Sequence, residues 1–149
     1  MAAAIEAVAR GCQVTVIDEG TMPGGQIFRQ SDPSLDVSEF AEAGERTRKH
    51  ALLARFQEAL DRIEYRPNAT AFALFANREV HVSQSGATEV LRPDAIVLAT
   101  GVREMAVPFP GWTTPGVMFA GGMQSLLKAH GVLAGRNIVV AGCGPLPLD

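Results

Sequence analysis

The stretch Val14-Thr15-Val16-Ile17-Asp18-Glu19 decides the fold class of this chain. Its four β-branched residues predict a short buried strand, and two acids follow that strand directly. Before it, the alanine-rich residues 2–10 predict a helix, which Gly11 ends. A helix, a tight glycine and a parallel-type strand in this order are typical of the second half of a βαβ unit. The sequence therefore predicts an α/β fold.

Composition narrows the class of protein. The 149 residues are 47% hydrophobic and 19% charged, which suits one domain with a buried core. Thirteen basic and sixteen acidic residues give a net charge of -3 with no basic stripe, so we expect no nucleic-acid partner. No apolar run reaches the roughly 18 residues of a membrane span, and no signal peptide is recognisable, so we expect a cytoplasmic location. The two cysteines are far apart and predict neither a disulfide scaffold nor a metal site.

The remaining segments differ in their hydrophobic period. Residues 38–63 have the 3-4-3 spacing of a helix, and residues 64–92 alternate as in an antiparallel β-meander. The apolar runs 95–99 and 137–141 predict two further buried strands, and residues from about 122 to 130 predict a further helix.

Three strand ends could bind a nucleotide. In a dinucleotide-binding fold, an acid after the second strand hydrogen-bonds a ribose, and Asp18 stands in that position with Glu19 beside it. Gly24-Gly25 would let a flat or anionic ligand approach the backbone closely. Thr100-Gly101, after another apolar run, would allow the same close approach. Taken singly, each could also be an ordinary turn.

Further segments carry a specific resemblance. They are Pro23-Gly24-Gly25-Gln26-Ile27, Ala99-Thr100-Gly101 with Glu104, Pro108-Phe109-Pro110-Gly111-Trp112, Pro115-Gly116-Val117-Met118, Gly122-Met123-Gln124 and Val140-Ala141-Gly142-Cys143-Gly144-Pro145-Leu146. In order and spacing they resemble the FAD- and NAD(P)-binding flavoproteins with two dinucleotide domains. Within that family they are similar to the FAD subunits of opine oxidases, D-hydroxyproline and proline dehydrogenases, hydrogen cyanide synthase and the sarcosine oxidase alpha chain.

The resemblance implies a Rossmann-like FAD-binding fold and a role for particular residues. Asp18 and Glu19 would hold the adenosine ribose, Ala71 would meet the adenine through its backbone, and the remaining candidates would contact FAD or begin an NAD(P)-type fingerprint. Those beside FAD are Gly24, Gly25, Gln26, Thr100 and Gly101, and those of the fingerprint are Gly142 and Gly144. The implied reaction is oxidation of an amine or imino acid by FAD, with other oxidoreductase subunits as partners and NAD(P) as a second cofactor. No catalytic residue or metal ligand is implied.

The sequence also departs from the family pattern. The opening strand and its GxGxxG are missing, and Pro147 occupies the third glycine position of the second fingerprint. We therefore expect residues 1–134 to be a partial FAD domain, with the meander at about 64–92, and 135–149 to be the truncated start of an NAD(P)-type domain. Such a fragment is expected to bind FAD weakly or not at all, unless 138–140 fills the vacant place beside 14–17.

Two other functions stay open. One is a non-catalytic remnant that no longer binds FAD. The other is a pyridine-nucleotide-dependent flavoprotein resembling the disulfide reductases, which is disfavoured because no CxxxxC motif follows Gly24-Gly25-Gln26.

Overall fold

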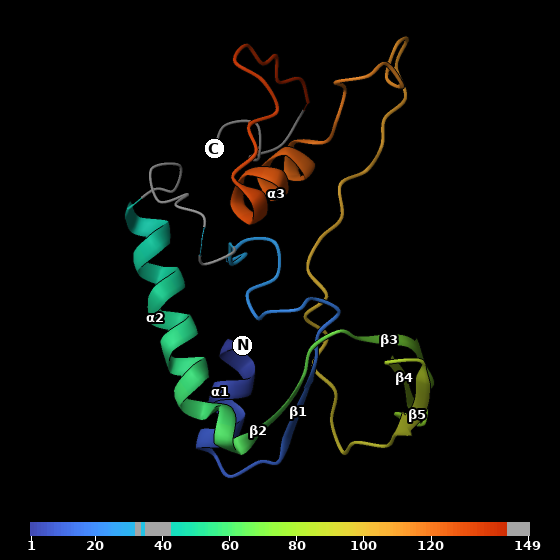
Figure 1. Cartoon of the computed structure of the whole chain (residues 1–149). Coiled ribbons are helices and arrows are strands. Elements are labelled where there is room, and N and C mark those ends of the chain that lie inside the picture. Colours follow the sequence, from blue (N-terminus) through green and yellow to red (C-terminus); the bar gives the residue numbers. More distant parts are fainter. Residues whose placement is uncertain (32–33, 35–42, 143–149) are drawn as a thin grey trace.

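The computed structural model describes residues 1–31, 34 and 43–142, with the backbone alone for 43–46 (Figure 1). It is a mixed α/β structure with one parallel and one antiparallel sheet. Its elements are α1 (Ala2–Ala9), β1 (Val14–Ile17), α2 (Ala43–Ala59), the 3-10 helix η2 (Leu60–Arg62), β2 (Ile63–Arg66), β3 (Ala69–Leu74), β4 (Val80–Gln84), β5 (Ala87–Leu91) and α3 (Ala120–His130).

The parallel sheet pairs β1 with β2, and its register runs from Val14 opposite Ile63 to Ile17 opposite Arg66. The first strand has the bounds that the sequence predicts. The helix expected over 38–63 ends earlier than predicted, because α2 ends at Ala59 and Ile63 begins a strand; residues 38–42 of the predicted helix lie outside the described residues. Ile63 fits both the helical spacing and a strand, and it joins the strand because pairing with β1 supplies backbone hydrogen bonds.

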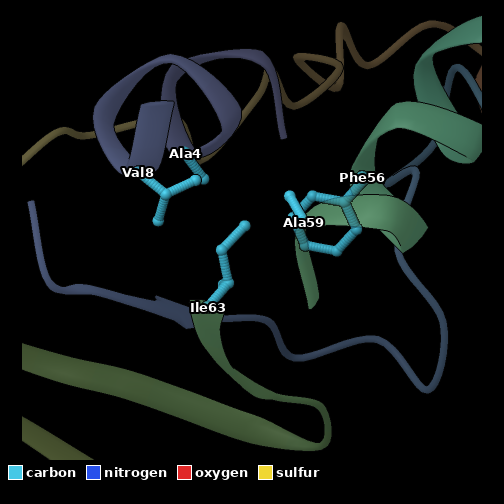
Figure 2. Close-up of a cluster of buried hydrophobic side chains, with 5 residues drawn as sticks. All are labelled: Ala4, Val8, Phe56, Ala59 and Ile63. Atoms are coloured by element: carbon cyan, nitrogen blue, oxygen red, sulfur yellow. The ribbon is translucent and has the colours of Figure 1, made fainter. Parts of the chain in front are cut away.

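The hydrophobic core lies where α1 and α2 meet the start of β2. Figure 2 shows Ala4 and Val8 of α1 facing Phe56, Ala59 and Ile63. Phe56 is 1% exposed, and Val14, Val16 and Tyr65 pack against the same cluster from the sheet. The core therefore holds the two strands together as well as the two helices.

The antiparallel meander is confirmed in β3, β4 and β5. The two turns are where the sequence places them, and Arg78, Ser85 and Gly86 adopt positive φ there. The meander begins at Ala69 rather than near 64, because residues 63–66 pair with β1 instead. A bulge lies between Ala71 and Ala73.

The two other predicted strands are wrong for the described residues. Neither 95–99 nor 137–141 is a strand, and Val97, Leu98 and Val139 are 72%, 71% and 95% exposed. An apolar run becomes a strand only against a neighbouring edge, and β1 pairs with β2 alone in its sheet. The proposal that 138–140 lies beside β1 is wrong for the same reason.

The last helix is confirmed. α3 begins after Phe119, slightly earlier than predicted, and ends at His130, where Gly131 caps it in the left-handed conformation with φ 63°. It lies beside the loop that follows β1 (Figure 1), and Lys128 Nζ donates a hydrogen bond to the carbonyl oxygen of Ile27 at 3.3 Å.

Replacing Phe56 by alanine tests the core. We expect Phe56→Ala to lower the free energy of unfolding by about 3–5 kcal/mol, because it leaves a cavity between α2 and the parallel sheet. Chemical denaturation measures the change. The control is Phe109→Ala, which truncates a ring that is 54% exposed and should cost far less. Equal losses in the two variants would contradict this position of the core.

Candidate nucleotide-binding site

Asp18 directly follows β1, at the carboxyl end of the parallel sheet. Its backbone N–H donates to the carbonyl oxygen of Arg66 at 3.1 Å, which continues the strand pairing by one step. Its own carbonyl oxygen accepts from the N–H of Ala69, the first residue of β3, at 3.0 Å. The backbone at Asp18 is therefore fixed by both sheets.

The carboxylate of Asp18 is fixed at both oxygens. The backbone N–H of Gly20 donates to Oδ1 at 2.8 Å, and the hydroxyl of Tyr65 donates to Oδ2 at 3.2 Å. The first bond is that of an Asx turn, so the turn interpretation of Asp18 is correct as local structure. The group is half-buried, whereas the neighbouring Glu19 is exposed.

Tyr65 is the residue at this site that sequence reasoning missed. Burial first, then the negative charge of Asp18 and the hydrogen bond to it, raise the pKa of the Tyr65 phenol well above its usual value. The phenol therefore remains a neutral donor at physiological pH. Tyr65 reaches the site through the register of β2 with β1, which puts it opposite Val16 and which no local sequence pattern indicates.

Ala71 belongs to the same region. It lies on β3, two residues after the Ala69 amide that binds Asp18, and pairs with Val82 beside the bulge. The residue is exposed. The structure thus brings the start of β3 to the end of β1, although contact with an adenine stays a prediction.

Gly24 and Gly25 form a tight turn with φ 129° and 61°. A Cβ on Gly24 would lie 2.2 Å from the carbonyl oxygen of Phe28, whose N–H closes the turn on the Gly24 carbonyl at 3.1 Å. A side chain is therefore excluded at Gly24 by the backbone itself. Gly25 has open space where a Cβ would be, so it leaves its backbone accessible.

Gln26 lines a cavity of about 270 Å³ together with residues from two distant segments. Glu104 also lines this cavity, and its Oε2 accepts from the N–H of Gly121, in the first turn of α3, at 3.0 Å. A carboxylate is favourable at a helix N-terminus. The full lining is Gln26, Arg103, Glu104, Ala106, Phe119, Gly121, Gly122 and Ser125.

Among the described residues, the candidates thus form two groups. The hydrogen-bond partners of Asp18 and the lining of the Gln26 cavity have no residue in common. Thr100 and Gly101 are exposed and lie in a segment without regular secondary structure that leads to Glu104, and Gly101 has φ 76°. Gly142 is exposed at the end of the described chain, and Gly144 lies outside the described residues.

A family model shows where the chain belongs. The model of the pyridine nucleotide-disulphide oxidoreductases matches residues 1–149. The chain belongs to this family. The family binds FAD and NAD(P), which agrees with the resemblance read from the sequence.

Three curated proteins are similar to this chain in sequence. An opine oxidase subunit of Rhizobium meliloti is 41% identical over 98% of this chain, and the HcnB subunit of hydrogen cyanide synthase from Pseudomonas aeruginosa is 32% identical over 98%. The alpha subunit of sarcosine oxidase from Corynebacterium sp. (strain P-1) is 31% identical over 95%. The chain spans 29%, 32% and 16% of these relatives. No solved structure matches it.

Within the part of the chain that the structure describes, no helix has the length and apolar character needed to cross a membrane.

The link between Tyr65 and Asp18 can be read in a pH titration, because Tyr65 is the chain's single tyrosine. Its phenol should ionise above the usual pKa of about 10, and Asp18→Asn should lower that midpoint by removing the nearby charge. Ultraviolet absorbance of the phenolate measures it. Glu19→Gln, which neutralises the exposed neighbouring acid, is the control. A midpoint unchanged by Asp18→Asn would contradict the contact.

The raised pKa of Tyr65 also determines how the free energy of unfolding changes at alkaline pH. Because the pKa is raised on folding, the stabilising contribution of Tyr65 is complete below about pH 10 and is lost as the pH rises further.

Replacing Glu104 tests the attachment of α3. We expect Glu104→Ala to destabilise the helix by about 1 kcal/mol, since it removes the acceptor for the Gly121 amide. Faster hydrogen exchange at the start of α3 measures this loss. Glu104→Gln keeps an acceptor oxygen and should have a smaller effect. Unchanged exchange in Glu104→Ala would show that the carboxylate does not cap α3.

Proposed function

We propose that this chain is the adenosine-binding part of a Rossmann-like FAD domain in an FAD-dependent oxidoreductase. The observation that carries the proposal is the carboxylate of Asp18, held at the carboxyl end of β1 by Gly20 and Tyr65. Open α/β sheets bind nucleotides at this edge, where an acid accepts hydrogen bonds from the ribose hydroxyls. Glu19 is the second acid available there.

The residues of the chain fit an FAD molecule in part. Asp18 offers a fixed anionic acceptor to the ribose, and the open side of Gly25 offers bare backbone to the flavin end. Gln26 would contact the cofactor from the second group of residues, Thr100 and Gly101 would contact it from the segment that leads to Glu104, and Ala71 would face the adenine. The 149 residues contain no GxGxxG, so the amides that neutralise the pyrophosphate are not supplied by that motif.

The division into domains follows the same proposal. Residues 1–134 belong to the FAD domain, and residues 135–149 begin an NAD(P)-type domain with Gly142 and Gly144 in its fingerprint. The exposed backbone at Gly142 is compatible with such a turn.

The reaction we propose for the complete enzyme is the oxidation of an amine or imino acid. FAD supplies the redox chemistry when bound, and the protein supplies binding and electrostatics. The relatives named opine oxidase and sarcosine oxidase support this reaction class. The three relatives are each named as one subunit of an enzyme, which supports an assembly with other oxidoreductase subunits.

No observation favours a dithiol active site in this chain. Its two cysteines, Cys12 and Cys143, lie near opposite ends of the sequence, and Cys12 is exposed. The rival that must be separated from the proposal is a remnant without affinity for FAD.

A titration with FAD separates the two. We expect weak, reversible binding to the purified chain, followed by the change in flavin fluorescence. Asp18→Asn should weaken it about tenfold or more, because hydrogen bonds to a charged group contribute about 1.5–3 kcal/mol each. The matched control is Asp61→Asn, which removes the same charge from η2, just before the start of β2 at the opposite end of the parallel sheet. No binding would favour the remnant, and equal binding by both variants would show that Asp18 does not hold the ribose.

A further inference from the structure

The orientation of the Asp18 carboxylate depends on a residue from a neighbouring strand. Tyr65 comes from β2, and its ring packs edge-on against Phe56 of α2, with centroids 5.6 Å apart and an interplanar angle of 89°. Its hydroxyl reaches Oδ2 of Asp18 from that packed position. The ring is therefore held by the core while the hydroxyl is at the candidate site.

We propose that Tyr65 is a positioning residue for a ribose diol: its hydroxyl holds Oδ2 of Asp18 while the Gly20 amide holds Oδ1, so that the carboxylate is already oriented when a nucleoside diphosphate binds. This inference rests on the proposed function, because it assigns Asp18 to the ribose. It goes beyond that function by adding Tyr65 to the site and by naming nucleoside diphosphates with both ribose hydroxyls as the ligand class.

The acceptor capacity of the carboxylate agrees with this role. An ionised carboxyl group has two oxygens and about four lone-pair positions. Gly20 and Tyr65 occupy one position on each oxygen. About two positions are left, one on each oxygen, which is the number that two vicinal hydroxyls require. Tyr65 thus fixes the group without consuming the capacity needed for the sugar.

The fixed carboxylate also lowers the cost of binding. A free aspartate rotates about its side-chain bonds and loses that freedom when it binds a ligand. Asp18 has already lost it, because donors from the turn after β1 and from β2 hold its two oxygens. Orientation before binding increases affinity mainly by reducing this loss. The neutral phenol remains in place as a donor across the physiological pH range.

A double-mutant experiment on the full chain tests the proposal. The probes are ADP and its 2′,3′-dideoxy analogue, titrated at millimolar concentration and followed by protein NMR. We expect Tyr65→Phe to weaken ADP binding about threefold to tenfold, a factor within the range of one ordinary intramolecular hydrogen bond, because Tyr65 acts on the ligand only through Asp18. The same substitution should not change binding of the dideoxy analogue, which has no diol. In an Asp18→Asn background it should not change ADP binding either.

The variant preserves the packed ring, so folding is expected to be retained and is checked by chemical denaturation. Equal weakening of both probes, or weakening that persists with Asp18→Asn, would show a merely structural role and overturn the inference. An Asp18→Asn variant that loses ADP affinity while Tyr65→Phe keeps it would overturn only the role of Tyr65. Absence of ADP binding, or binding indifferent to Asp18→Asn, would overturn the adenosine site itself.

Discussion

The parallel pairing of β1 with β2 is the constraint on which the candidate site depends. Its register puts Val16 opposite Tyr65 and brings the chain to Asp18 one residue after the last pair. The Arg66 carbonyl then binds the Asp18 amide and the Ala69 amide binds the Asp18 carbonyl, so the strand end is held on both sides. A shift of this register by one residue would move Tyr65 to the other face of the sheet, away from both Phe56 and Asp18.

Packing and chemistry are joined at Tyr65. The Tyr65 side chain packs against the buried cluster, and its hydroxyl contacts Asp18. A tyrosine suits this place because its ring is apolar while its hydroxyl needs a partner when buried. The core formed by α1 and α2 therefore does more than stabilise the chain, since it determines where the Tyr65 hydroxyl meets Asp18.

The sequence predicts the elements whose signals are local. The helix before Gly11, the strand up to Asp18, the meander turns and the helix before Gly131 all depend on neighbouring residues, and all are found. The errors arise where the structure depends on distant partners. Ile63 continues a helical spacing but pairs with Val14, and the run 95–99 has strand composition without strand pairing. Asp18 could be found as a strand-end acid, whereas its contact with Tyr65 required the register between two strands that are separated in sequence by the whole of α2.

The two groups of candidate residues differ in how firmly they are held. The Asp18 group is built on a paired sheet and a closed core, so its opening requires disruption of the best-packed part of the described chain. The Gln26 group lies outside the buried core, and the Glu104–Gly121 and Lys128–Ile27 hydrogen bonds join its distant segments. Val102, Met105 and Val107 are neighbours in sequence of the lining residues Arg103, Glu104 and Ala106. Their apolar side chains are exposed and therefore add little buried surface to this group. A ligand that reached both groups would therefore bind a fixed acid at one end and order a looser segment at the other. Ordering that segment reduces the net free energy of binding. Affinity therefore depends least on rearrangement at the ribose end of the site, where the acid is already fixed.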